Sequence, residues 1–312
     1  MDALWTELFW IGLLTAAVRL ATPILLASLG EIIAERAGVL NVGLEGMMLV
    51  GAFAGFVAAQ GSGSPWAGIV AGLFGGCLLG LLFAFFTVAL AVDQIVCGIT
   101  INLLALGLTG YLHRVIYGLT SAMPKAPSIA QWNIPGLSEL PFVGPVLFQQ
   151  NGLVYLAIVL VLVCWFALFR TTFGLKLRAV GEYPNAADSV GINVFHIRYA
   201  AMAACGALAG LGGAFLSIGQ LNMFVEGMTG GRGFIALAVV IFARWNPIGA
   251  LLAAVLFGAA EALQFRLQVL TVEIPFQFLA MLPYLLTIAV LVTMRRSVQP
   301  AALARPFIKE MR

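Results

Sequence analysis

The residues of this sequence that could do chemistry are few and widely separated. His113 and His196 are the two histidines, and neither has a partner at the spacing of a metal site or of a nucleophile with its base. No G-x-x-x-x-G-K-[ST] phosphate loop occurs, because no glycine precedes Lys125, Lys176 or Lys309. The chain is therefore expected not to be an enzyme, to bind no ATP in this way, and to hold no metal or cofactor.

The elements around these residues are overwhelmingly apolar. Hydrophobic residues make up 62% of the chain, charged residues 9%, and the mean hydropathy is +1.05. Soluble proteins carry roughly 25% charged residues. The composition predicts an all-α polytopic membrane protein, one transmembrane domain over residues 1–312 that lies in the cell (inner) membrane and contacts the lipid bilayer. A net charge of +3, scattered beside the apolar runs, does not favour nucleic-acid binding.

Apolar runs suited to cross a bilayer recur along the chain. We expect about nine transmembrane helices, within a range of roughly eight to ten. Their approximate limits are Phe9–Leu29, Gly46–Ala59, Trp66–Leu90, Ile95–Tyr117, Gly152–Leu168, Tyr199–Ile218, Phe234–Ala243, Ile248–Leu263 and Pro275–Met294. The third carries glycines at 68, 72, 76 and 80, a spacing that predicts close approach of another helix. Residues 30–46, rich in charge, predict a broken or re-entrant segment beside a water-filled cavity.

Two polar intervals predict the orientation. Residues 119–151 contain five of the thirteen prolines and one basic residue, so we place them as an extracytoplasmic loop. This loop is a candidate surface for an external partner, or a plain cap over the helices. Residues 169–198 contain more basic than acidic residues, which predicts a cytoplasmic loop. The basic C-terminal tail is placed on the same side, and the N-terminus outside.

One short sequence pattern occurs twice. Residues 40–47 read LNVGLEGM and residues 221–228 read LNMFVEGM, each a polar break between apolar runs. If the two lie toward opposite sides of the membrane, they indicate an inverted repeat with a substrate path at its interface. Five polar residues are assigned to this path as a hypothesis: Asn41, Glu45, Asn102, Asn222 and Glu226. In the alternative, the recurrence of the pattern is a coincidence and Asn102 only bonds a neighbouring helix. The two glutamates then cap helix starts or pair with Arg36 and Arg232.

Within the loop of residues 169–198, a short helix is expected over Pro184–Val190. Proline suits a first helical position, and Gly191 suits the left-handed residue that ends a helix. A helix this short is marginal in water, so we expect it to dock on another surface. The run FGLKLRAVGEYPNAADSVGINV around it resembles the cytoplasmic coupling loop of permease subunits of ABC importers. The resemblance is to the simple sugar and nucleoside (branched-chain amino acid permease-like) family, which works with lipoproteins of the basic membrane protein type.

Two further runs, ERAGVLNVGLEGMMLVGAF and MTGGRGFIALAVVIFARWNPIGA, resemble the same family. The resemblance implies a permease subunit of an ATP-driven importer for nucleosides or a related neutral polar solute. Its implied partners are a cytoplasmic ABC ATPase, which would hydrolyse ATP, a second permease subunit forming a heterodimer, and an extracytoplasmic substrate-binding lipoprotein. The residues that the resemblance assigns to the ATPase contact are Gly181, Glu182, Pro184, Asn185, Ala186, Ala187 and Gly191.

A second hypothesis is an ion- or proton-coupled secondary transporter built from inverted repeats. Arg19, Glu45 and Glu261 would be its coupling groups, because charges within spans are functional candidates. The cytoplasmic loop favours the importer, since a secondary transporter has no use for a helix of this form. Stacking of a substrate base on Phe224 or Trp132 is a further possibility, although aromatic residues near membrane interfaces commonly form belts.

Overall fold

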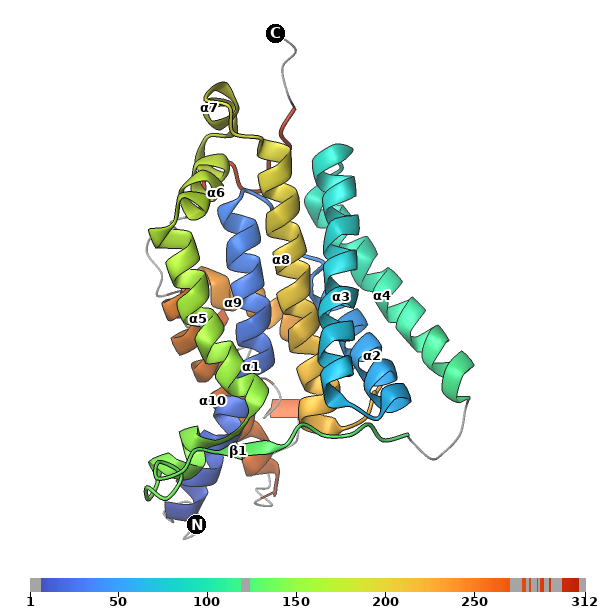
Figure 1. Cartoon of the computed structure of the whole chain (residues 1–312), viewed down its shortest axis with the longest axis vertical. Coiled ribbons are helices and arrows are strands. Elements are labelled where there is room, and N and C mark those ends of the chain that lie inside the picture. The colour runs from blue at the N-terminus through green and yellow to red at the C-terminus, as the bar shows by residue number, and fades with distance from the viewer. Residues whose placement is uncertain are drawn as a thin grey trace.

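The computed structural model describes residues 7–118, 124–269 and 299–308, together with residues 277, 278, 281, 285, 287, 288 and 292. The described residues form a bundle of helices with one small sheet (Figure 1). Seven helices are long and apolar enough to cross a membrane. They are α1 (Glu7–Arg36), α2 (Leu44–Ser62), α3 (Pro65–Ala84, extended by a π-helical turn to Ala89), α4 (Gln94–Tyr117), α5 (Gly152–Arg170), α8 (Val194–Ala214, extended by π-helical turns to Leu221) and α10 (Pro247–Val269).

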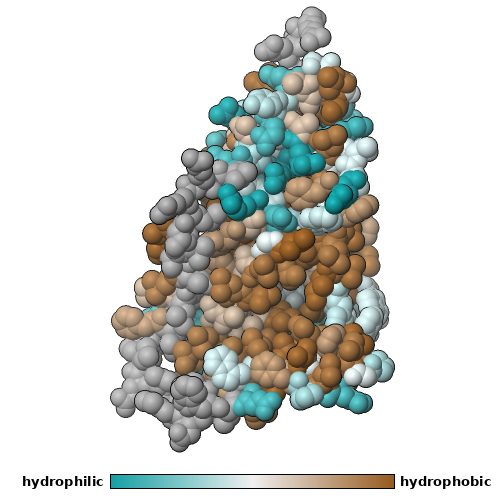
Figure 2. Space-filling view, turned by 90° about the vertical axis from the view of Figure 1, so that its left-hand side faces the viewer, coloured by the Kyte–Doolittle hydropathy of each residue, from teal (hydrophilic) through white to brown (hydrophobic). Residues whose placement is uncertain are grey.

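An eighth apolar helix, α9 (Arg232–Phe242), is shorter and corresponds to the short seventh predicted span. The all-α polytopic architecture is therefore confirmed, with eight of the predicted spans present as helices. The ninth predicted span, Pro275–Met294, lies outside the continuously described residues. Figure 2 shows a broad hydrophobic area over the lower and middle part of one face, and hydrophilic residues gathered above it.

The two polar intervals lie at opposite ends of the bundle (Figure 1). At one end, which we call the α7 end, stand α6 (Thr172–Glu182), α7 (Pro184–Ser189) and residues 299–308. At the other, the hairpin end, strands β1 (Gln131–Asn133) and β2 (Gln149–Asn151) pair antiparallel beside the start of α1. Residues 169–198 hold the predicted short helix as α7, and also α6, a helix that the sequence analysis did not predict.

Close glycine contacts hold α3 against α8. A Cβ added at Gly76 would lie 2.1 Å from the carbonyl oxygen of Gly206, and one at Gly80 would lie 2.4 Å from that of Met202. Such distances are accessible only when both helices present small residues. The predicted close approach along the glycine face of α3 is thus confirmed, and α8 becomes the central, most enclosed helix of the bundle.

The break predicted over residues 30–46 is wrong in its extent. α1 continues to Arg36, and only residues 37–43 are irregular before α2 begins. Glu31 stays in the helix because its Oε1 accepts the backbone N–H of Asn41 at 2.8 Å, and Glu35 accepts the indole N–H of Trp245. The side chains around the break are buried, so protein surrounds it and not a water-filled cavity.

Candidate functional site

The predicted short helix is present at the α7 end. α7 covers Pro184–Ser189, one residue less than predicted, and Gly191 follows it with φ +85°. The preceding helix, α6, begins where Thr171 Oγ1 accepts the backbone N–H of Gly174 at 3.2 Å. Asn193 Oδ1 in turn accepts the N–H of His196 at 3.0 Å and starts α8. The helices before and after α7 therefore each begin at a side-chain cap, and α7 stands at the tip of the molecule (Figure 1).

The seven residues assigned to an ATPase contact divide into two groups. Pro184 is half-buried and four are exposed: Glu182, Asn185, Ala186 and Gly191. Gly181 is buried against the end of α1, where an added Cβ would meet the carbonyl oxygen of Arg36 at 2.1 Å. Ala187 is buried in an apolar cluster with Val180, Val194 and Phe307. The exposed group can touch a partner, whereas Gly181 and Ala187 hold α6 and α7 on the bundle.

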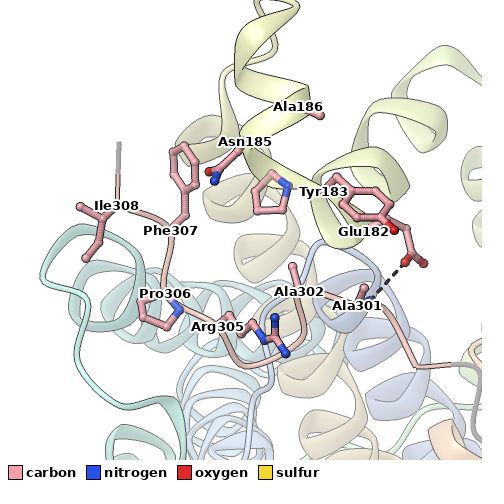
Figure 3. Close-up of a pocket in the computed structure, with 11 residues that line it drawn as sticks. Glu182, Tyr183, Asn185, Ala186, Ala301, Ala302, Arg305, Pro306, Phe307 and Ile308 are labelled. Carbon is pink, nitrogen blue, oxygen red and sulfur yellow. Dashed lines mark hydrogen bonds between the residues drawn. The ribbon is translucent and has the colours of Figure 1, made fainter. Parts of the chain in front are cut away.

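A groove of about 600 Å³ separates α7 from the C-terminal segment, which we define as residues 299–308 (Figure 3). Residues 182–186 line one side, and residues 301, 302 and 305–308 line the other. The sequence analysis missed this second side, because the tail was assigned from its charge alone. The apolar run Pro306–Phe307–Ile308 between basic residues was the available signal.

Glu45, in the first copy of the repeated pattern, contacts the residues that follow the second copy. Its Oε1 accepts the backbone N–H of Gly231 at 2.8 Å, and its Oε2 accepts that of Gly233 at 2.7 Å. These N–H groups belong to the first turn of α9, so the carboxylate caps a helix N-terminus, where negative charge is favoured. The glutamate of the first copy thus holds the helix that follows the second copy.

Asn41 and Asn102 stabilise the break between α1 and α2. Asn41 is fully buried, and its Oδ1 accepts the backbone N–H of Gly43 at 3.0 Å. Asn102 of α4 accepts the N–H of Gly46 at 2.8 Å through Oδ1 and donates to the carbonyl oxygen of Val42 at 2.9 Å through Nδ2. Both carboxamides therefore replace backbone partners that an irregular segment lacks.

Asn222 and Glu226, in the second copy, lie toward the hairpin end. The backbone carbonyl of Asn222 accepts the N–H of Ala126, and its φ is +56°. Glu226 accepts two hydrogen bonds from Arg114 of α4, at 2.8 and 2.9 Å, which lower the pKa of Glu226 below its ordinary value. By contrast, the break of residues 37–43 touches the C-terminal segment, since Gly38 lies beside Ala302. The second copy thus lies toward the hairpin end, and the break that leads into the first copy touches the α7 end; the inverted repeat stays a prediction.

The pairing of these glutamates with Arg36 and Arg232 is wrong. Arg36 donates to the carbonyl oxygen of Trp245 at 3.2 Å, because that carbonyl lies beside the end of α1. Arg232 forms a mostly buried ion pair with Glu261 of α10. Arg232 and Glu261 therefore pair with each other within the bundle through one nitrogen and one oxygen, and Arg232 does not pair with Glu45 or Glu226.

A polar cavity of about 320 Å³ opens at the hairpin end. Its polar lining residues come from α1, the segment before β1, both strands, the end of α8 and the residue after it: Arg19, Ser128, Gln131, Asn151, Gln220 and Asn222. Arg19 also donates to Gln150 Oε1 at 3.2 Å, so this guanidinium has a polar partner in strand β2. Carboxamides and a guanidinium offer both donors and acceptors to a neutral polar solute. Phe224 is 2% exposed and packs edge-on against Phe53, so it is not open to a ligand, whereas Trp132 is 52% exposed.

Residues 13–294 match the family described as the permease component of branched-chain amino acid transport systems. The chain belongs to this permease family. It is 39% identical over 310 residues to the guanosine ABC transporter permease protein NupQ of Bacillus subtilis, covering 95% of this chain and 96% of that one. It is 41% identical over 299 residues to the nucleoside ABC transporter permease protein NupC of Lactococcus lactis (93% and 94% covered). It is also 41% identical over 332 residues to a putative glucose ABC transporter permease protein of Haloferax volcanii (97% and 99%).

A different guanosine ABC transporter permease protein of Bacillus subtilis, NupP, is 30% identical to this permease over 274 residues. That organism therefore has two distinct permease proteins named for guanosine, both similar to this chain. No solved structure gives a significant match.

Proposed function

We propose that this permease imports nucleosides as one membrane subunit of an ATP-driven importer. The observation that supports this most directly is its similarity, over more than nine-tenths of its length, to guanosine and nucleoside permease proteins from two organisms. The carboxamide-lined cavity at the hairpin end supports a neutral cargo rich in hydroxyl groups and ring nitrogens. A simple sugar such as glucose is the second candidate, because the glucose permease relative is equally similar.

In this proposal α7 docks on a cytoplasmic ABC ATPase. The exposed residues Glu182, Asn185, Ala186 and Gly191 would make the contact, and closure of the ATPase on ATP would move the spans attached to α7. Movement can pass to the membrane helices because Gly181 lies directly against the end of α1. The basic residues of this end agree with a cytoplasmic location.

Two further subunits complete the assembly. ATPase sites close in pairs, and this chain offers one α7, so a second permease is required; two distinct guanosine permeases in Bacillus subtilis support a heterodimer. The extracytoplasmic lipoprotein would bind the hairpin end. Large apolar residues are exposed there, namely Trp132, Leu137, Leu140 and Phe142, as expected for a protein-binding surface.

Uptake into proteoliposomes tests the function. The permease is co-reconstituted with its ATPase, second permease and lipoprotein, and labelled guanosine is added outside with ATP inside. We expect uptake to need ATP, to persist when the proton gradient is collapsed, and to be competed by unlabelled adenosine but not by glucose. Uptake of labelled glucose, with none of labelled guanosine, favours the sugar candidate. Uptake that stops with the proton gradient refutes ATP-driven import and supports the secondary transporter.

The substrate path is tested at Asn222, which lines the hairpin-end cavity. Asn222→Leu should raise the substrate concentration for half-maximal uptake, because an amide that can bond the solute is lost. The matched control is Asn133→Leu, an exposed asparagine on the neighbouring strand that does not line the cavity. Equal uptake by both variants, with equal amounts of assembled complex, removes Asn222 from the path. Asn41→Leu gives the corresponding test at the break of residues 37–43, where Asn41 also accepts a backbone hydrogen bond.

A further inference from the structure

The C-terminal segment is joined to the end of α6 by two hydrogen bonds. The backbone N–H of Ala302 donates to the carbonyl oxygen of Gly181 at 2.9 Å. The backbone N–H of Ala301 donates to Glu182 Oε2 at 3.2 Å (Figure 3). The segment therefore occupies a defined place beside the residues that lead into α7, and it is not merely a basic tail near the membrane.

Arg198 of α8 fixes the same segment to the membrane helices. Its side chain is 0% exposed; Nη1 donates to the carbonyl oxygen of Arg305 at 3.1 Å, and Nε donates to that of Ala37 at 3.3 Å. Among the described residues, no carboxylate forms a salt bridge with this guanidinium. A buried cation is costly unless it is hydrogen-bonded, and the carbonyl end of α1 is a favourable place for it. Arg198 thus connects α8, the end of α1 and the C-terminal segment at one point.

Neighbouring residues of the segment face in opposite directions. Phe307 is 7% exposed and packs edge-on against Phe195 of α8, with ring centroids 5.6 Å apart. Ile308, the next residue, is 72% exposed. Across the groove, Tyr183 at the start of α7 is 70% exposed. Two large apolar side chains are therefore presented at the tip of the molecule, on either side of an apolar-walled groove.

We infer that the C-terminal segment is the second half of the ATPase-docking surface, and that the groove between it and α7 binds an apolar side chain of the ATPase. This inference rests on the proposed function. The groove is continuous with the exposed face of α7, since residues 182–186 belong to both. Exposed apolar residues beside a groove of this kind are typical of a protein contact. Because Arg198 anchors the segment, force applied to the docked surface reaches α1 and α8 together.

Photo-cross-linking tests the contact in the assembled complex. Single cysteines are introduced by Ala186→Cys on α7, Ile308→Cys on the segment and Leu137→Cys at the hairpin end, and each is labelled with a thiol-reactive benzophenone. The unsubstituted chain reports the background from its own cysteines, which are half-buried or buried. We expect ATPase adducts from Ala186→Cys and Ile308→Cys and none from Leu137→Cys. An adduct from Ala186→Cys alone overturns the inference but leaves the proposed function; adducts from neither overturn both.

Two substitutions measure the energetic consequences. Ile308→Asp places a charge in the contact and should weaken co-purification of the ATPase about tenfold, whereas Ile308→Leu should not.

Arg198→Lys keeps the charge but cannot donate from two nitrogens in one plane. It should lower uptake per ATP hydrolysed by about fivefold or more, with the cross-link from Ala186→Cys retained. Unchanged uptake per ATP refutes the role of Arg198, and so does a loss confined to the amount of assembled complex.

Discussion

Replacing Gly76 by alanine should force α3 and α8 apart. The added Cβ would lie 2.1 Å from the carbonyl oxygen of Gly206 and 2.6 Å from the Cα of Gly210, whereas ordinary van der Waals contact begins at 3.4 Å. Both neighbours are backbone atoms, so neither can rotate away, and the helices must separate by about 1 Å. Overpacking of this kind lowers the stability by about 1–3 kcal/mol, and the higher helix propensity of alanine offsets up to about 1 kcal/mol of that loss. We expect a net loss of about 1–2 kcal/mol, which corresponds to a thermal midpoint about 2–8 °C lower in detergent.

Gly107→Ala is the matched control for this substitution. Gly107 lies in α4, a membrane helix of similar length, and a Cβ there meets nothing within 4 Å. The control should therefore leave the midpoint unchanged or raise it slightly, since only the helix-propensity gain applies. A midpoint for Gly76→Ala equal to or above that of Gly107→Ala would refute the conclusion that backbone contact determines the spacing of α3 and α8.

Three further substitutions test the polar contacts. Glu45→Gln keeps the size of the side chain but loses its charge at the start of α9, and should lower stability in the same assay by about 0.5–2 kcal/mol. Asn102→Leu removes the side-chain partner of the Gly46 N–H and of the Val42 carbonyl oxygen, and should lower the stability by about 1–3 kcal/mol. The pKa of Glu226 is lowered from 4.5 by Arg114, so the pair stabilises fully above pH 4.5 and the effect is lost as the pH falls through the lowered value. Glu226→Gln should remove this acid-dependent component from a pH series of thermal midpoints, and an unchanged series would contradict it.

The spans and α7 could be predicted from the sequence because their causes are local. Apolar runs of bilayer length produce the membrane helices, and Pro184 and Gly191 mark the limits of α7. α6 was missed because its basic residues favoured a loop. Its helical signal was present, since Thr171 is a capping residue and Leu177 and Val180 recur at helical spacing on the buried face.

The extent of the first break could not be predicted, because its determinants are distant in the chain. Glu31 and Glu35 resemble loop residues in sequence, yet both are buried in α1. Glu35 bonds to Trp245, 210 residues away, and no local pattern reports that contact. The position of the C-terminal segment could not be predicted for the same reason. The Gly181 carbonyl and the Arg198 guanidinium that bind it lie more than 100 residues earlier in the chain.

The contacts observed form a continuous connection from α7 to α1, α2, α8 and α9. Gly181 meets the end of α1, Arg198 joins α8 to the residue after α1, and Glu45 in the first turn of α2 links α2 to the start of α9. Each step involves a backbone group, which has little freedom to adjust, and α3 is held to α8 by its glycines. We therefore expect α1, α2, α3, α8 and α9 to move as one body when α7 is displaced. The change of access must then occur at the boundary of that body, either against the remaining helices or against the second permease, and not within it.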